Sequence, residues 1–357
     1  MNDRSNSASE TPRRSALPVA HDASVGVSDS AARELRDRSG RRVDYLRVSV
    51  TERCNLRCTY CMPAEGLPAA PDTAALSFDD IVFVAQTACS LGVDRIRLTG
   101  GEPLLRRGLT ELVRKLRAET DVRDIALTTN ALLLPKHAQA LRDAGLSRLN
   151  VSLDSLRADR FERIARSRLL DETLRGIDAA EEAGFGPIKI NTVIVHGFND
   201  DEVDLWMERI KERQWIVRFL ELMPIGEGAA LRRLGGFEDV SALRDRLIDS
   251  HGIEPTDAPH GNGPARYWRV PGGGMVGFIT PMSQPYCDTC SRFRLTSDGR
   301  IRPCLAFDVD VDARPAIESR DSQALRRFFG HAAEIKPSGH QWHGGQTTST
   351  GMSTLGG

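Results

Sequence analysis

The feature that most constrains the fold is a regular alternation of short apolar runs with longer amphipathic stretches, which begins at Tyr45. Strand-like runs occupy residues 45–50, 95–99, 124–129, 148–154, 188–195 and 215–223, and helical patterns occupy residues 78–91, 109–118, 135–144, 171–183 and 202–212. Such alternation is typical of βαβ units with parallel strands. Six strands are two fewer than a closed eight-stranded barrel needs. We therefore expect an α/β fold with either an incomplete (βα)6 barrel or a doubly wound sheet.

The strands carry polar side chains at every second position. These polar residues are Arg47, Ser49, Thr51, Arg97, Thr99, Asn150, Ser152, Asp154, Lys189 and Asn191. We expect the apolar set to face the helices and the polar set to line a wet interior; the alternative is a solvated sheet face without helices. Arg47, Arg97 and Lys189 would be costly to bury without anions. These cations therefore predict that the interior binds a negatively charged ligand.

The chain divides into four segments by composition. Residues 1–42 contain no aromatic residue and predict a disordered leader, because such a segment buries too little surface to offset the entropy of ordering. The barrel would occupy residues 43–260. Beyond it, Gly, Pro and short strand-like pieces at 265–270 and 275–280 replace the helices, which predicts a smaller C-terminal α+β subdomain over residues 261–338. The Gly-rich residues 339–357 predict a flexible tail ending in Gly356 and Gly357.

Composition excludes several functional classes. Lys and Arg number 48 against 49 Asp and Glu, and this balance disfavours a nucleic-acid binder. No apolar run is long enough to span a membrane, and the N-terminal region lacks the apolar core of a secretory signal. Seven Cys is an odd number, and six of them form two triads, which favours metal binding in a reducing compartment over disulfides. We therefore expect a cytoplasmic protein.

The first cysteine triad comprises Cys54, Cys58 and Cys61, which directly follow the first predicted strand. Three thiolates on one loop can ligate three corners of an iron–sulfur cubane and leave one iron open. Zinc is the alternative, but structural zinc favours four closed ligands. A redox thiol pair would leave the third cysteine unused.

The second cysteine triad comprises Cys287, Cys290 and Cys304. It predicts either a second cluster with an open iron or an incomplete zinc ribbon completed by His251 or His260. Arg292 and Arg294 follow it closely, and paired guanidinium groups suit phosphate, although a surface charge pair is the plain alternative. Cys89 belongs to neither triad and is expected to be ordinary core.

The spacing of the first triad after a barrel strand resembles the radical S-adenosylmethionine superfamily. The resemblance implies a 4Fe–4S cluster on Cys54, Cys58 and Cys61, whose open iron binds S-adenosylmethionine. Reductive cleavage would then yield a 5′-deoxyadenosyl radical. It further implies that the Gly-Gly turn at Gly101 binds the methionine part and that Tyr60 lies against adenine.

Longer matches resemble the GTP 3′,8-cyclase family of molybdenum cofactor biosynthesis over residues 43–357. They lie at residues 47–54, 98–104, 128–130, 150–154 and 287–295, and in the terminal Gly-Gly pair. The resemblance implies two 4Fe–4S clusters, on the first and second triads. For S-adenosylmethionine it implies Tyr60, Gly101, Ser152 and Met223. For GTP it implies Arg47, Arg97, Thr128, Lys189, Arg292, Phe293 and Arg294. For catalysis it implies Gly356 and Gly357.

The implied reaction is radical cyclisation of GTP to (8S)-3′,8-cyclo-7,8-dihydroguanosine 5′-triphosphate. Implied partners are an electron donor such as flavodoxin or ferredoxin and the downstream cyclic pyranopterin monophosphate synthase, and the resemblance leaves room for a homodimer. The alternatives are a radical peptide maturase with an auxiliary cluster and a non-catalytic zinc-binding module. The sequence departs from the family where Ala131 replaces a usual Gly, where residues 165–168 lack another Gly, and in its long leader.

Overall fold

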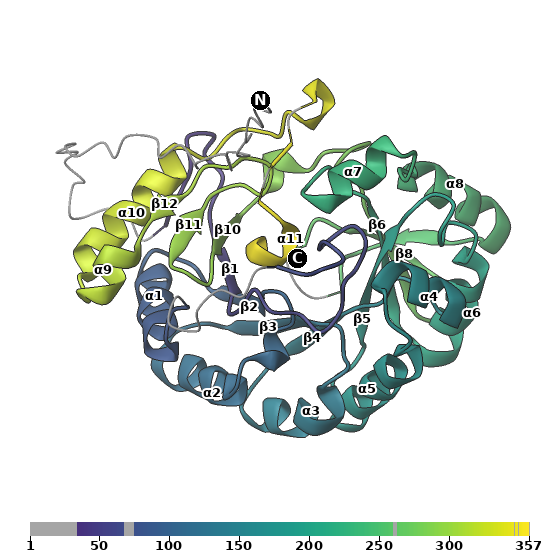
Figure 1. The fold of residues 1–357 in the computed structure, drawn as a ribbon, viewed down its shortest axis with the longest axis horizontal. Coiled ribbons are helices and arrows are strands. Elements are labelled where there is room, and N and C mark those ends of the chain that lie inside the picture. The colour runs from purple at the N-terminus through teal and green to yellow at the C-terminus, as the bar shows by residue number, and fades with distance from the viewer. Residues whose placement is uncertain (1–33, 68–74, 260–262, 346, 349, 357) are drawn as a thin grey trace, which may run out of the picture. The chain divides into compact units, whose positions relative to one another are not determined.

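A single twelve-stranded sheet dominates the computed structural model, which describes residues 34–67, 75–259, 263–345, 347–348 and 350–356. The strand order is β12-β11-β10-β1-β2-β3-β4-β5-β6-β9-β8-β7. Figure 1 shows the strands following a curve, with α1, α2, α3, α5 and α6 outside it and α11 inside it.

The six central strands form the predicted parallel, incomplete barrel. They are β1 (Tyr45–Ser49), β2 (Arg95–Thr99), β3 (Asp124–Thr129), β4 (Arg148–Ser152), β5 (Lys189–Ile194) and β6 (Ile216–Glu221). Each strand pairs in parallel with the next in chain order. The connecting helices are α1 (Phe78–Ser90), α2 (Leu109–Glu119), α3 (Leu134–Asp143), α4 (Ala158–Ala165), α5 (Leu170–Glu182) and α6 (Val203–Arg213). The predicted fold class is confirmed, and the sequence reading missed α4.

Local sequence explains where α1 begins. Ser77 caps α1 by accepting a hydrogen bond from Asp80 N at 3.1 Å, and the Asp80 carboxylate accepts one from Ser77 N at 2.8 Å. This capping box satisfies two backbone donors that have no partner inside the helix. The apolar residues Ile81, Ala85 and Ala88 then recur at helical spacing and pack into the core.

The sheet has one apolar and one polar face, as the alternation predicts. Leu46 and Val48 of β1 pack into the large hydrophobic core, as do the corresponding residues of the neighbouring strands. Arg47 lies in register with Arg97 on one side and with Arg294 on the other. Residues in register on neighbouring strands share a face, so these three cations lie together on the concave face of the sheet.

The C-terminal strands extend this sheet at both edges. They are β7 (Glu254–Thr256), β8 (Arg266–Arg269), β9 (Met275–Ile279), β10 (Arg292–Leu295), β11 (Arg300–Arg302) and β12 (Val311–Asp312). β9 pairs in parallel with β6, and β10 pairs in parallel with β1. The predicted domain boundary at residue 260 therefore does not divide the sheet. Each open edge of the six-stranded core pairs with a strand from the later segment.

The expectation that helices cease near residue 260 was wrong. Beyond α7 (Glu227–Arg233) and α8 (Val240–His251), the chain forms α9 (Arg314–Glu318), α10 (Ser322–Glu334) and α11 (Met352–Leu355), with short 3-10 turns η3 (Cys287–Thr289) and η4 (Trp342–Gly344). A further 3-10 turn, η2 (Pro103–Leu105), follows β2. α10 begins at Asp321, whose carboxylate accepts a hydrogen bond from Ala324 N. Its residues Leu325, Phe329 and Ala332 are fully buried. Their helical spacing is present in the sequence and was overlooked.

The predicted disordered leader is too long at its C-terminal end. Residues 1–33 lie outside the described part of the chain, but residues 34–42 are folded. Leu35 N donates to Leu91 O and Val43 N donates to Leu35 O, each at 2.8 Å. Arg41 and Asp37 form a buried ion pair at 2.6 Å. This segment is ordered because it adds a turn to the edge of the core.

The described part of the Gly-rich tail is also packed rather than flexible. Leu355 is 1% exposed and Trp342 is 8% exposed, and both belong to a small apolar cluster with Ile225 and Met282. Gly357 lies outside the described residues. Over the described ranges, no helix has the length and apolar character that crossing a membrane requires.

Candidate active site

The first cysteine triad lies on the loop that follows β1. Cys61 N and Met62 N both donate to Cys58 O, which closes a tight turn around the last two cysteines. Thr59 N donates to Ile164 O at 2.9 Å, so the end of α4 fixes this loop. Three cysteines are therefore presented together at the carboxyl end of a barrel strand.

The electrostatics of the first triad suit a metal cluster. Burial raises the pKa of the Cys61 thiol to about 12, and the neighbouring Cys54 and Asp154 add to the effect. Burial, Asp154 and the other two thiols also raise the pKa of Cys58 well above its ordinary value. The three sulfur atoms are thus close enough to repel as thiolates, and a bound cation would offset that repulsion.

The number of cysteines in each triad bears on the kind of metal it can hold. Structural zinc takes four closed ligands, whereas three thiolates can ligate three irons of a cubane and leave the fourth iron open. Each triad supplies three free cysteines, which fits a cubane.

The predicted S-adenosylmethionine residues gather around this loop. The Tyr60 hydroxyl donates to Asp154 Oδ2 at 2.8 Å. Ser152 ends β4, two residues before Asp154. A Cβ placed on Gly228 of α7 would lie 2.5 Å from Met223 O and 3.4 Å from Tyr60 O, so this glycine lets the Met223 and Tyr60 segments meet.

The Gly-Gly turn after β2 is required by a close backbone approach. A Cβ on Gly101 would lie 2.4 Å from Arg53 O, and one on Gly100 would lie 2.2 Å from Thr51 O. Gly101 N donates to Thr51 O at 2.8 Å. The turn therefore packs directly against the start of the cysteine loop, and any residue with a side chain would displace that loop.

Arg47, Arg97 and Arg294 form a row of cations across β2, β1 and β10. Burial lowers the pKa of Arg47 well below its ordinary value, and Arg294 and Arg97 lower it further. Burial and Arg292 likewise lower the pKa of Arg294 to about 10. These guanidinium groups repel one another in a poorly solvated place, so an anion bound among them would be strongly favoured.

A second group of polar residues lies on β3 to β6. Thr128 is in register with Asn150, and Asn150 is in register with Lys189. The Lys189 ammonium donates to Pro259 O at 2.7 Å. Burial lowers the pKa of Lys189 to about 7, with further contributions from nearby arginines, of which Arg218 is the largest.

Arg218 is a cation of this interior that the sequence reading missed. It is 4% exposed, and its guanidinium donates to Asn150 Oδ1 at 2.5 Å. The signal was available, because Arg218 interrupts the apolar run 215–223 at an inward-facing position. The Nε atoms of Arg97 and Arg218, Thr128 Oγ1 and Asn191 Oδ1 are buried and have no hydrogen-bond partner among the described residues. Such atoms fit a polar ligand in the interior.

Glu102 and Asp154 are buried acids whose roles the motifs did not reveal. Glu102 accepts hydrogen bonds from Leu104 N, Thr129 Oγ1 and Asn130 N, and burial raises its pKa to about 7. Asp154 accepts from Val193 N and Tyr60, and burial raises its pKa to about 6. Both acids tie together loops at the carboxyl ends of neighbouring strands.

The second cysteine triad lies at the opposite end of the barrel from the first. Cys287 and Cys290 precede β10, whereas the first triad follows β1, and these two strands are parallel neighbours. Cys304 follows β11, which is antiparallel to β10, so it returns to the end where Cys290 lies. The cation row therefore lies between the two triads.

Two residues predicted to bind substrate have different surroundings. Arg292 lies over the Tyr286 ring, 5.1 Å from its centroid, and shares a sheet face with Arg294. Phe293 is 1% exposed and belongs to the large hydrophobic core. Alternation turns its side chain to the helix-covered face, between two inward-facing arginines.

The C-terminal tail enters the barrel. The Arg294 guanidinium donates to Leu355 O at 2.9 Å and to Gly356 O at 2.6 Å. A Cβ on Gly356 would lie 2.3 Å from Thr99 Cγ2. The predicted catalytic residue Gly356 thus lies at the carboxyl end of β2, and Gly357 is outside the described residues.

The structure explains one departure from the family pattern. Ala131, where the resemblance expects Gly, has a positive φ of 68°. This left-handed conformation costs an L-residue about 1–2 kcal/mol. The Ala131 methyl is fully buried, and this burial offsets part of the cost.

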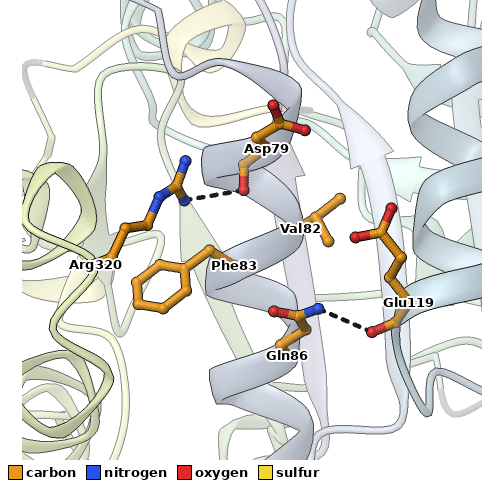
Figure 2. A pocket seen from close by; sticks show the side chains of 6 residues that line it. All are labelled: Asp79, Val82, Phe83, Gln86, Glu119 and Arg320. Carbon is orange, nitrogen blue, oxygen red and sulfur yellow. Dashed lines mark hydrogen bonds between the residues drawn. The ribbon is translucent and has the colours of Figure 1, made fainter.

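Two surface features lie apart from this site. Figure 2 shows a pocket beside α1, lined by Asp79, Val82, Phe83, Gln86, Glu119 and Arg320. Its polar groups bind one another: Arg320 donates to Asp79 O and Gln86 donates to Glu119 O.

The His196 ring lies 3.0 Å from Asp200 and 3.1 Å from Glu238, which is explained by ordinary ion pairing on the surface.

Comparison with known proteins identifies the family. Residues 48–210 match the model of the Radical SAM superfamily, and residues 215–342 match Molybdenum Cofactor Synthesis C. The chain is 44% identical over 328 residues to the GTP 3′,8-cyclase of Pelotomaculum thermopropionicum, covering 90% of this chain and 100% of that one. It is 42% identical to the GTP 3′,8-cyclase of Petrotoga mobilis, covering 86% and 95%. This chain belongs to the GTP 3′,8-cyclase family of radical S-adenosylmethionine enzymes.

Family membership confirms the predicted enzyme class, a radical lyase of molybdenum cofactor biosynthesis that uses S-adenosylmethionine and a 4Fe–4S cluster. A solved structure with a similar fold is Streptococcus suis SuiB bound to S-adenosylmethionine, with a TM-score of 0.54 and 16% identity, covering 82% of this chain and 66% of that chain. SuiB has also been solved with its precursor peptide SuiA. Likeness at this identity shows the fold alone, so it does not favour the peptide-maturase alternative.

Proposed function

We propose that this chain binds GTP in the barrel interior, between clusters on its two cysteine triads, and cyclises it between C3′ and C8. Bound S-adenosylmethionine and its cluster supply the chemistry that removes the 3′ hydrogen of GTP. The chain's own residues position the two cofactors, orient the nucleotide and exclude water. The observation that carries this proposal is the row of buried cations between the two triads.

The triphosphate is assigned to the inward-facing cations. Arg47, Arg97 and Arg294 lie side by side in register, and Lys189 and Arg218 lie across the interior. Guanidinium groups bind phosphate oxygens in a bidentate manner. Burial and mutual repulsion lower the pKa values of Arg47 and Lys189, and an anion bound here would offset both effects. The Thr128 hydroxyl is available to a sugar or phosphate oxygen.

S-adenosylmethionine is assigned to the first triad and its surroundings. Cys54, Cys58 and Cys61 would hold the cluster. Tyr60, Gly101, Ser152 and Met223 border it, and the Tyr60–Asp154 hydrogen bond fixes the loop that would hold the adenine. These are the loops at the carboxyl ends of parallel strands, where barrel enzymes bind their ligands.

The second triad is assigned to a second 4Fe–4S cluster that holds the guanine end of the substrate. Cys287, Cys290 and Cys304 supply three thiolates, which leaves one iron for a substrate atom. Arg292 lies on β10 between this end and Arg294, which belongs to the cation row. The nucleotide would therefore lie along the strands, with its base at one end of the barrel.

The tail is assigned a role in shielding the reaction. Gly356 lies among buried groups, and Arg294 holds the two carbonyls before Gly357. A radical reaction requires exclusion of solvent. We infer that Gly356 and Gly357 close the open side of the barrel.

Partners and compartment are further inferences. Reductive cleavage needs an electron donor such as flavodoxin or ferredoxin, and the cyclic product needs a downstream cyclic pyranopterin monophosphate synthase. A homodimer is compatible with the fold. All seven cysteines are free, and free thiols are maintained in a reducing compartment, which supports the cytoplasm.

Metal analysis tests the cluster assignment. Anaerobic reconstitution should give about eight iron and eight sulfide per chain, from two cubanes. Cys54→Ala should abolish cleavage of S-adenosylmethionine, whereas Cys290→Ala should retain uncoupled cleavage. Zinc in either triad, or four iron atoms in total, would contradict the assignment.

Calorimetry tests the triphosphate assignment. Lys189→Ala, Arg292→Ala and Arg294→Ala should each weaken GTP binding about ten- to a hundred-fold, since charge-assisted hydrogen bonds contribute roughly 1.5–3 kcal/mol. S-adenosylmethionine affinity should change much less. Arg117→Ala is the matched control, because Arg117 also donates to backbone carbonyls but lies between α2 and the loop before β4. Unchanged GTP affinity in all three variants would place the triphosphate elsewhere.

A further inference from the structure

Two buried cations lie beside the second cysteine triad and have no part in the function above. Arg41 comes from the folded end of the N-terminal segment, and Lys336 follows α10. Their exposures are low: 8% for the Arg41 side chain and 5% for Lys336. Burying a charge is unfavourable unless it is paired, so their partners should reveal why they are here.

The Lys336 ammonium links the segment that carries Cys290 to the segment that carries Cys304. It donates to Arg292 O at 2.9 Å, two residues after Cys290, and to Pro303 O at 2.7 Å, directly before Cys304. Its third contact is to Cys290 Sγ at 3.7 Å. An ammonium has three hydrogens, and all three are directed at the triad and its neighbouring backbone.

Arg41 binds the segment that carries the third cysteine, Cys287. Its guanidinium donates to Cys287 O at 2.7 Å, to Ser338 O at 2.9 Å and to Pro337 O at 2.6 Å. The same side chain forms its ion pair with Asp37, which also accepts hydrogen bonds from Ser39 N and Arg41 N. Arg41 therefore links Cys287 to the residues that follow Lys336.

The backbone alone fixes the triad only loosely. β10 and β11 form a hairpin with two register pairs, Arg294 with Arg302 and Leu295 with Ile301. Cys290 and Cys304 lie beyond the end of this ladder, and Cys287 lies on the short turn η3 (Cys287–Thr289). Bonds from Lys336 and Arg41 to carbonyls beside all three cysteines supply the missing constraint.

The two cations differ in the charge they leave for a ligand. Asp37 neutralises Arg41 at close range. Among the described partners of Lys336 there is no carboxylate, and its ammonium lies 3.7 Å from Cys290 Sγ. A cubane held by three thiolates carries net negative charge, and nearby charge and hydrogen bonds to sulfur set its reduction potential. Lys336 and Arg292, whose side chain hydrogen-bonds Cys290, are thus the counter-charges of the second triad, whereas Asp37 balances the charge of Arg41.

We propose that Lys336 is a positioning residue for the second cluster, which it orients through Arg292 O and Pro303 O and whose charge it balances through Cys290. This inference rests on the proposed assignment of a cluster to that triad. It predicts different consequences for the two cations. Loss of Lys336 should change both the retention and the reduction potential of the cluster, whereas loss of Arg41 should change retention alone.

The experiment isolates the second cluster in the full-length chain. A background with Cys54, Cys58 and Cys61 replaced by Ala leaves one cluster, which is followed by iron content, release to a chelator and a potentiometric titration read by electron paramagnetic resonance. Lys336→Met should release iron about ten-fold faster or more and lower the reduction potential. Lys336→Arg, which retains the charge, should restore the potential. Arg41→Met should accelerate release with the potential unchanged.

Arg117→Met is the matched control, because it removes a carbonyl-binding cation far from the triad and should change neither quantity. If Lys336→Met does not fold, Lys336→Gln provides the same loss of charge with a hydrogen-bond donor retained. A wild-type release rate and potential in Lys336→Met, or in Lys336→Gln where that variant replaces it, would overturn the inference. Absence of any cluster in the background protein would instead refute the proposed function, so the two failures are distinguishable.

Discussion

Gly356→Ala tests whether the tail must dock inside the barrel. A Cβ at this position would lie 2.3 Å from Thr99 Cγ2 and 3.3 Å from Thr99 Oγ1. Gly356 also has φ 71° and ψ 93°, a backbone conformation that L-residues rarely adopt. Thr99 is 2% exposed and has little freedom to move aside. The substitution therefore meets both a steric and a conformational barrier.

The expected cost follows from these two terms. A positive φ costs an L-residue about 1–2 kcal/mol. Overpacking of a filled site costs about 1–3 kcal/mol. Together they destabilise the docked tail by about 2–5 kcal/mol, which lowers the docked-to-undocked ratio roughly thirty-fold or more. Thr99→Ser removes the clashing methyl but not the strained φ, so the double variant should recover only the packing part.

Hydrogen exchange of the C-terminal peptide and product formed per S-adenosylmethionine cleaved are the two measurements. Gly356→Ala should lose protection and coupling, while iron content and GTP affinity stay close to wild type. Adding Thr99→Ser should restore part of both. Deletion of Gly356 and Gly357 gives the fully undocked reference. Full protection and full coupling in Gly356→Ala, with no effect of Thr99→Ser, would refute the docked arrangement.

Three further predictions rest on other parts of the structure. Gly176→Ala in α5 should destabilise the protein by more than about 2 kcal/mol, because its Cβ would lie 2.0 Å from Ala131 O. Gly330→Ala in α10, which has open space around it, should stabilise the protein by about 0.5–1 kcal/mol. Urea unfolding of both apoproteins measures these changes, and equal effects would show that helix propensity alone determines them. Lys189 has its pKa lowered to about 7, so at pH 8 it is mostly neutral and must take up a proton when the triphosphate binds. GTP affinity should therefore fall as pH rises above 7, calorimetry in buffers of different ionisation enthalpy should detect proton uptake, and Lys189→Arg should abolish it. Arg218→Met should weaken GTP binding about ten-fold or more without changing S-adenosylmethionine affinity, and equal loss for both ligands would assign Arg218 a purely structural role.

Much of the site was readable because its chemistry depends on local spacing. The first triad, the Gly-Gly turn and the alternation of Arg47 with apolar neighbours all lie within short segments. Periodicity of two fixes which side chains share a sheet face, and it placed Arg47, Arg97 and Lys189 in the interior correctly. The same rule, applied to β10, turns the Phe293 side chain to the helix-covered face.

What periodicity could not provide is the pairing of distant segments. β10 pairs with β1 across more than two hundred residues, and this pairing alone brings Arg294 beside Arg47 and sets the two triads at opposite ends of the barrel. α10 was not predicted, although the helical spacing of Leu325, Phe329 and Ala332 is present in the sequence. The folded residues 34–42 were missed because their stability comes from contacts with Leu91 and Cys287, not from their own composition.

The sequence by itself determined the parallel barrel, the cysteine triads and the polar lining, since each follows from spacing along one strand or loop. Only the tertiary structure decided that Arg294 holds the tail and that Lys336 and Arg41 hold the second triad. The physical reason is that strand periodicity shows which face a cation lies on, but not which groups from distant segments it binds. Here those partners are backbone carbonyls, which every residue has and no side-chain pattern reveals.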